Sequence, residues 1–283
     1  MIARITRMIA LLSVLLWEAG FCRAAPAPDD KDKQPAKPTA EEIQMAEKAI
    51  KNKFEPLKNA DDKLLVHITD DAVARALPGR VVFAVVFPQY PVARLAPEPL
   101  KLQNVFIVDK DGKVEHATDA KGLEKTFRGA LAPVKDDGAA KDAAQAWLRL
   151  SEELHQDKFF QFTIPEKDLA VEKEQDGRKA TGRAVVEPKG GNQGQIVVTL
   201  LFDADGKLVK ADEKADLKPG IRPICQATKL LDADPIVRRM AEQDILVMGR
   251  SAKPYLDEQR AGAKPELQQA IDRIWQRIVE EGR

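Results

Sequence analysis

Cysteine is nearly absent from this chain of 283 residues, which contains only Cys22 and Cys225. Two thiols cannot build a disulfide framework or a thiolate zinc cluster. The fold must therefore depend on its hydrophobic core. The chain also has no excess of positive or negative charge, because 45 basic residues balance 45 acidic ones. This balance excludes the strongly basic class of nucleic-acid-binding proteins.

Aromatic residues are scarce as well, with 10 Phe, 3 Trp and 2 Tyr. A stacking platform for nucleic-acid bases would need more of them. The longest apolar run beyond the N-terminus is Val81–Phe87, far short of the ~20 residues that span a bilayer. We therefore expect neither a nucleic-acid partner nor a membrane span in the mature chain.

Residues 1–24 have the order typical of a secretory signal peptide. Arg4 and Arg7 come first, an apolar run over Met8–Trp17 follows, and small residues lead to Ala24. Cleavage near Ala24 predicts an extracytoplasmic protein, secreted or periplasmic, in which Cys225 is the only thiol. Lipid attachment at Cys22 is the minor alternative, although Phe21 and Ala19 depart from the lipoprotein pattern.

Residues 25–39 combine four prolines with six charged residues, and alanine is their only apolar type. Such a segment cannot bury a core and is expected to be a disordered linker. Thr39 and Glu42 then match a capping box at the start of a helix.

Residues 40–134 predict a first α+β module. After the helix that starts near Ala40, strands are expected at Leu64–Ile68, Val81–Phe87, Asn104–Asp109 and Lys113–Ala117, and a short helix at 123–131. Val81–Phe87 is uniformly apolar, as in a strand covered on both faces. Asp-Lys-Asp-Gly between the last two strands indicates a hairpin.

Residues 135–222 predict a second module. Its helix is expected over Ala139–Leu154, and its strands at Phe159–Ile164, Leu169–Glu174, Lys179–Glu187, Gln195–Phe202 and Lys207–Ala211. Because VFIVDKDGKVEHATD (105–119) resembles TLLFDADGKLVKADE (199–213), the two modules could be a duplication. The alternative is a common turn that occurs twice.

Residues 223–283 carry helical signals. Asp234-Pro235 predicts a helix start, Gly249 its end, and further helices are expected over 252–260 and from Pro265. The apolar face of the first of these helices is predicted to comprise Ile236, Val237, Met240, Ala241, Ile245 and Met248. The expected fold class is therefore α+β, with one or two helix-on-antiparallel-sheet modules followed by a small all-α pack.

Two family resemblances accompany this interpretation. Asp234-Pro235-Ile236-Val237-Arg238, followed by Gly249 and Pro254-Tyr255-Leu256, resembles a single HEAT-type repeat, which implies a helical interaction surface. The helix-then-meander order is similar to the cystatin-like architecture. Gln195–Thr199 matches two positions of the inhibitor motif Gln-x-Val-x-Gly but lies within an expected strand.

Residues able to perform hydrolytic chemistry are few. Beyond the signal the only serines are Ser151 and Ser251, and the histidines are His67, His116 and His155. Neither serine lies in Gly-x-Ser-x-Gly. Cys225 has no recognisable histidine partner and is expected to be a buried small residue.

Binding motifs for metals and phosphate are incomplete. The turns at Asp109/Asp111 and Asp203/Asp205 lack the Gly and Glu positions of a calcium loop, and side-chain turn chemistry is sufficient to explain them. The loop Lys189–Gly194 leads into a strand and not into a helix, so a hairpin is favoured over a phosphate site. No catalytic, cofactor or metal residue is assigned.

The sequence leaves three hypotheses. The first is a non-enzymatic interaction or scaffold module whose partner is another extracytoplasmic protein. The second is an enzyme or small-ligand binder with a site between sheet and helices. The third is a divergent cystatin-like inhibitor, which needs a protruding hairpin at Gln195–Thr199. The proline-rich loop 87–99, with Tyr90, could be functional or could cover a sheet edge.

Overall fold

The expected α+β class is confirmed by the computed structural model, which describes residues 37–59, 64–90, 95–220, 222 and 226–283. The helices are α1 (Ala40–Lys53), α2 (Asp71–Ala76), α3 (Ala120–Ala130), α4 (Asp137–Leu154), α5 (Pro235–Met248), α6 (Lys253–Ala261) and α7 (Pro265–Glu280). The strands are β1 (Leu65–His67), β2 (Arg80–Val86), β3 (Gln103–Asp109), β4 (Val114–Ala117), β5 (Phe162–Thr163), β6 (Ala170–Glu174), β7 (Gly177–Val186), β8 (Gln193–Asp203) and β9 (Leu208–Lys218). The expected signal peptide and nearly all of the expected linker lie outside the described residues.

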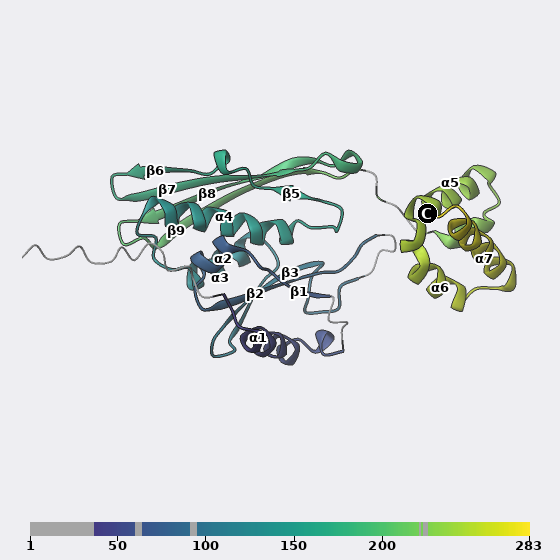
Figure 1. Ribbon diagram of the computed structural model, residues 1–283, viewed down its shortest axis with the longest axis horizontal. Helices are drawn as coiled ribbons and strands as arrows, with labels where there is room; N and C mark the ends of the chain where they lie inside the picture. Colours follow the sequence, from purple (N-terminus) through teal and green to yellow (C-terminus); the bar gives the residue numbers. More distant parts are fainter. Residues whose placement is uncertain (1–36, 60–63, 91–94, 221, 223–225) are drawn as a thin grey trace, which may run out of the picture. The chain divides into compact units, whose positions relative to one another are not determined.

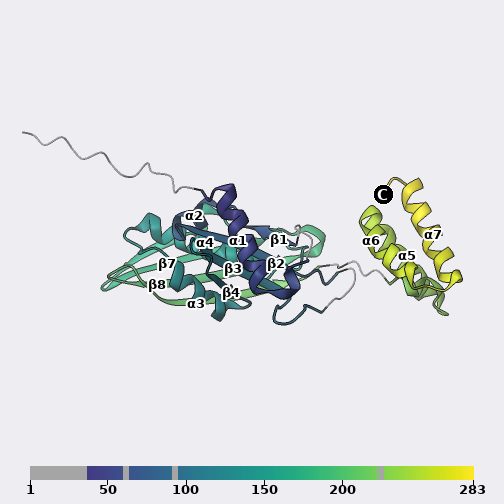
Figure 2. The same cartoon turned by 90° about the horizontal axis from the view of Figure 1, so that it is seen from below.

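The strands form two antiparallel sheets. The first has the order β1-β2-β3-β4, and the second has the order β5-β7-β8-β9 with β6 also paired to β7. Figure 1 shows α4 between the two sheets, and Figure 2 shows α1 across the outer side of the first sheet. In the part of the chain that the structure describes, no helix is long and apolar enough to cross a membrane.

The capping box predicted for the first helix is present. Thr39 Oγ1 accepts a hydrogen bond from Glu42 N–H at 3.2 Å, and Glu42 Oε2 accepts one from Thr39 N–H at 2.7 Å. These two bonds satisfy backbone donors that a helix otherwise leaves free. The helix ends at Phe54, two residues before Pro56, as the sequence indicated.

Strand β2 is covered on both faces, as its uniformly apolar sequence predicted. Val81 and Phe83 pack with Ile50 of α1, whereas Val82 belongs to the core around α4. Alternation of side chains along the strand accounts for this division. The first sheet is therefore buried between α1 and α4.

Helix α4 joins the two expected modules into one core. Ala140, Ala143 and Ala144 are fully buried, and their small size allows a close approach to both sheets. Trp147 and Leu148 fill the space farther along the helix. Residues of 40–134 and of 135–222 thus contribute to a single hydrophobic cluster.

The two sheets that share this core differ in the order of their secondary-structure elements. The first sheet has helix α2 between β1 and β2, which the sequence analysis missed, and the second has five strands with only short 3-10 turns and no α-helix among them. Asp70 caps α2 by accepting hydrogen bonds from Ala72 and Val73 N–H. The duplication stays a prediction.

Two strands depart from the expected bounds. Strand β5 covers only Phe162–Thr163, because Asp157 Oδ1 accepts hydrogen bonds from the N–H groups of Phe159 and Phe160 and holds them in a turn. Strand β9 continues to Lys218, beyond the predicted Ala211, and pairs with β8 along its length. Its second half, residues 213–218, is mostly charged and has no continuous apolar signal.

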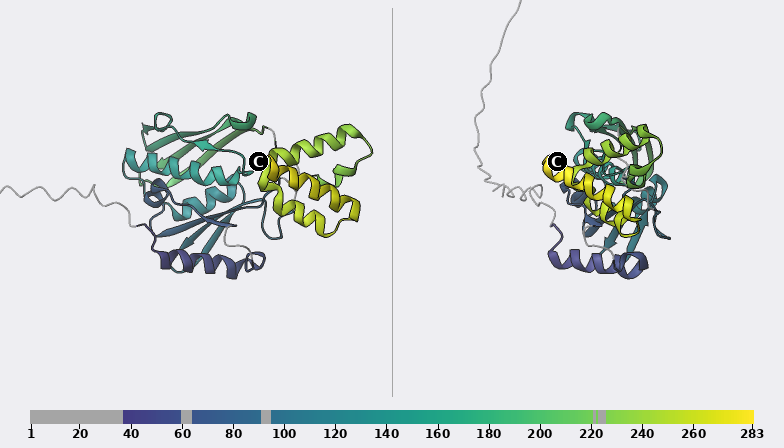
Figure 3. Two further views of the ribbon diagram at one scale, coloured as in Figure 1. Left: turned by 45° about the vertical axis from the view of Figure 1, so that its right-hand side comes forward. Right: turned by 90° about the vertical axis from the view of Figure 1, so that its right-hand side faces the viewer.

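The C-terminal helices α5, α6 and α7 have a core of their own (Figure 3). Asp234 caps α5 by accepting a hydrogen bond from Ile236 N–H at 2.7 Å, and Gly249 ends the helix at φ +56°, both as predicted. The predicted apolar face is wrong in part: Ala241, Ile245 and Leu246 are buried, whereas Ile236 and Met240 are exposed. At 100° per residue, Ile236 and Met240 lie on the side opposite Ile245.

Candidate functional site

The three histidines lie on different elements and have separate structural contacts. His67 Nδ1 is 3.3 Å from Thr69 Oγ1, and burial lowers the pKa of His67. His116 stacks on Phe106, and burial together with the charge of Lys53 lowers its pKa. Both rings therefore favour the neutral form.

The third histidine belongs to a cluster that the sequence analysis did not find. His155 Nε2 lies 2.9 Å from Glu213 Oε1, and Trp147 Nε1–H donates to Glu213 Oε2 at 2.6 Å. Burial would raise the pKa of Glu213, but the hydrogen bonds outweigh it and lower that pKa. The cluster ties α4 to β9, and a charge pointing inward from an edge strand is a recurrent structural device.

The serines are placed for packing. Ser151 is fully buried within α4, where no substrate can reach it. Ser251 Oγ donates to Met248 O at the end of α5. Cys225 lies outside the described residues.

A half-buried ionic cluster joins the start of α2 to the end of α4. Arg149 Nε donates to Asp70 Oδ2 at 3.1 Å, and Arg149 Nη1 donates to Glu152 Oε2 at 2.9 Å. Burial raises the pKa of Glu152 to about 7, the nearby acids Glu153 and Asp70 add to the rise, and Arg149 opposes it. Only the tertiary fold brings residues 70 and 149 together.

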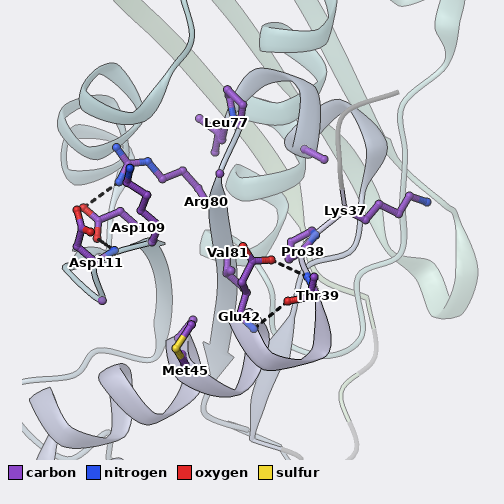
Figure 4. A pocket seen from close by; sticks show the side chains of 16 residues that line it. Lys37, Pro38, Thr39, Glu42, Met45, Leu77, Arg80, Val81, Asp109 and Asp111 are labelled. Carbon is purple, nitrogen blue, oxygen red and sulfur yellow. Dashed lines mark hydrogen bonds and ion pairs between the residues drawn. The ribbon is translucent and has the colours of Figure 1, made fainter. Parts of the chain in front are cut away.

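A cavity of about 520 Å³ lies beside the N-terminal half of α1 (Figure 4). Its apolar wall includes Met45, Leu77 and Val81. Arg80 in the same wall pairs with Asp109 at 3.1 Å, so this charge is already compensated. The volume falls within the range of small-molecule sites. The interface between α4 and the two sheets is filled by side chains.

The loops singled out by sequence have structural contacts. Asn192, in the loop Lys189–Gly194, is buried and donates to Phe159 O at 2.9 Å. Arg222 donates to Asn192 Oδ1 at 2.7 Å and to Asp157 Oδ2 at 2.6 Å, which ties the end of the second sheet together. Tyr90 makes an edge contact with Phe159, while residues 91–94 of the proline-rich loop are not described. A hairpin loop, as predicted, suits Lys189–Gly194.

The segment Gln195–Thr199 lies within β8 and pairs with β7 on one side and β9 on the other. A loop inhibitor inserts an exposed wedge, and a strand enclosed by two neighbours cannot supply one. The geometry that the inhibitor hypothesis requires of this segment is therefore not formed.

The outer face of α5 exposes three large apolar side chains. Ile236, Met240 and Val247 are 57%, 60% and 72% exposed. A groove of about 440 Å³ runs along this face, and Arg239, Leu246 and Arg277 are among its lining residues. Exposed apolar side chains that share one helix face are a feature of many interaction surfaces.

No three His, Cys, Asp or Glu side chains of the described residues gather closely enough to hold a metal ion. Comparison with known proteins finds no matching family model, curated protein or solved structure.

Proposed function

We propose that this chain is a non-enzymatic protein-interaction module that acts outside the cytoplasm, with the outer face of α5 as its binding surface. The observation that carries the proposal is the exposure of Ile236, Met240 and Val247 on one helix. Fully burying three such side chains contributes about 4–6 kcal/mol.

The spacing of the exposed residues supports a helical or groove-filling partner. Positions 236, 240, 243 and 247 are separated by four, three and four residues, which places them on one stripe of a 3.6-residue helix. Gln243 is the single polar member. Arg239 and Glu242 lie beside the stripe, and their opposite charges would fix the orientation of a bound partner.

Other features of the chain are consistent with such a role. The resemblance of 234–256 to a HEAT-type repeat implies an interaction surface, and the pattern of residues 1–24 implies export. Structural contacts account for the positions of the three histidines, of Ser251 and of Glu213.

The test uses a photoreactive amino acid at Gln243 in the full chain, made in cells that export it. We expect crosslinking to a defined partner, and at least about tenfold weaker binding of that partner to Met240→Lys/Val247→Lys, since two apolar contacts are lost.

Val279→Lys is the matched control, because Val279 is 47% exposed on α7 of the same pack. Equal binding by the double variant and the control, with unchanged circular dichroism, would contradict the proposal. The mass of the exported chain tests the location independently, with Ala25 expected as its first residue.

A further inference from the structure

Strand β9 lies at the edge of the second sheet and pairs only with β8 among the described strands. At its start, helix α3 covers the outer edge: Arg128 Nη2 donates to Val209 O at 2.7 Å, and Glu124 Oε1 accepts from Ala211 N–H at 3.3 Å. Backbone direction alternates along an antiparallel strand. The N–H and C=O groups of Glu213, Ala215 and Leu217 therefore face the same edge, beyond the reach of α3.

We infer that this free edge pairs with the same edge of a second copy of the chain. The charges along the strand carry the inference. Residues 210, 212, 214, 216 and 218 are Lys, Asp, Lys, Asp and Lys, and all five are exposed. A two-fold axis at Ala215 places Lys214 opposite Asp216 of the second copy, and Asp212 opposite Lys218. On this face of the strand, both kinds of facing charged pair, 214 with 216 and 212 with 218, then join opposite charges.

Charge and sterics select this register. A two-fold axis at Lys214 would place Lys214 opposite Lys214 of the second copy, and Asp212 opposite Asp216. A two-fold axis at Asp216 would place Asp216 opposite Asp216, and Lys214 opposite Lys218, so both registers bring like charges together. An axis at Glu213 would need the backbone of Val209 and Ala211, which α3 occupies. Like charges directly opposite are destabilising.

The ends of the paired segment also fit. Pro219 follows Lys218 and cannot extend the strand toward α3 of the other copy. Residues 213, 215 and 217 would form three hydrogen-bonded pairs, with about six backbone hydrogen bonds in all. Ala215 at the axis is small and exposed, which allows the backbones of the two copies to approach closely at this residue.

Charged residues on an edge strand commonly prevent pairing. A run of one sign would do so in every register. The alternation of Lys and Asp over residues 210–218 repels in some registers and attracts in the register centred on Ala215, whereas a register centred on Leu217 would place Ala215 opposite Pro219, which has no N–H to donate. The result would be a continuous sheet across two molecules, independent of the α5 surface.

The test measures association of the full chain by sedimentation velocity. The wild type is expected to dimerise. Lys214→Asp and Asp216→Lys should each weaken the dimer about tenfold, because two symmetry-related pairs become repulsive. An equimolar mixture of the two variants should restore association, since both kinds of facing charged pair again join opposite charges.

Lys210→Asp is the charge-matched control on the same strand: it lies outside the paired segment but bonds Asp212 at 2.6 Å, so it should weaken the dimer far less than Lys214→Asp does. Ala215→Pro removes an N–H group that faces the free edge and should abolish dimerisation, while circular dichroism shows that the sheet is intact.

A monomeric wild type, or a dimer that responds equally to Lys210→Asp and Lys214→Asp, would overturn the inference. Pairing with a strand of another protein would instead give a monomer and a mixed complex. Met240→Lys/Val247→Lys should not affect the dimer, so the two proposals fail separately.

Discussion

Burial of a single residue, Glu152, makes the free energy of unfolding depend on pH. The side chain has Arg149 as its hydrogen-bond partner through Oε2, while Oε1 is buried with no partner among the described residues. Burial raises the pKa from an ordinary 4.5 to about 7. The folded chain thus holds a proton that the unfolded chain releases, and the free energy of unfolding falls as the pH rises from about 4.5 to 7.

Glu152→Gln removes this titration but keeps an oxygen that accepts from Arg149. We expect the free energy of unfolding to rise by about 2 kcal/mol near pH 8 and to change little near pH 4. Urea unfolding across this pH range measures the effect. Glu174→Gln, an exposed acid on β6, is the control, and the same pH profile in both variants would refute the assignment.

At the scale of elements, the two Asp-x-Asp-Gly turns share one internal structure. Asp109 Oδ1 accepts from Lys113 N–H and Asp203 Oδ1 accepts from Lys207 N–H, each at 2.8 Å. Gly112 and Gly206 both have φ of +77°. The turn chemistry predicted from sequence is therefore confirmed, including the positive φ that favours glycine.

The surroundings of the two turns differ. A Cβ on Gly206 would lie 2.3 Å from Val134 O, whereas a Cβ on Gly112 would meet only the Ala49 side chain at 3.9 Å. We expect Gly112→Ala to lower the free energy of unfolding by about 1 kcal/mol and Gly206→Ala by about 3 kcal/mol or more. Thermal unfolding of the matched pair checks this difference. Equal losses would mean that Val134 moves aside.

Local signals predicted the bounds of most elements. Thr39, Asp234, Gly249 and the apolar run of β2 all act within a few residues of the chain. Helix α2 was missed because its six residues are too few to show a helical period, although Asp70 is a recognisable cap. The exposed stripe of α5 was misjudged because apolar residues occur around most of that helix, and only packing decides which of them are buried.

At the scale of the whole molecule, α4 packs against both sheets, and we therefore expect the two sheets to unfold together. Leu148 is fully buried in the core that both sheets share, close to Gly182 of β7. The helical pack of α5, α6 and α7 has a separate core, which shares no residue with it.

Leu148→Ala should therefore lower the free energy of unfolding by about 2–4 kcal/mol. Hydrogen exchange should accelerate together in β2, β3, β7 and β8 and stay unchanged in α5–α7. Ile245→Ala, in the core of the helical pack, should give the opposite pattern. Faster exchange in one sheet alone would show that the sheets unfold independently.

The amino-acid sequence alone determined the α+β class, the helix caps, the buried strand and both Asp-x-Asp-Gly turns, because each depends on neighbouring residues. The tertiary structure decided the rest: the shared core around α4, the contact of His155 with Glu213, the half-buried pair of Arg149 and Asp70, and the edge of β9 that no further described strand pairs with. These features join residues that are distant along the chain, and no local pattern specifies which distant groups share a buried space.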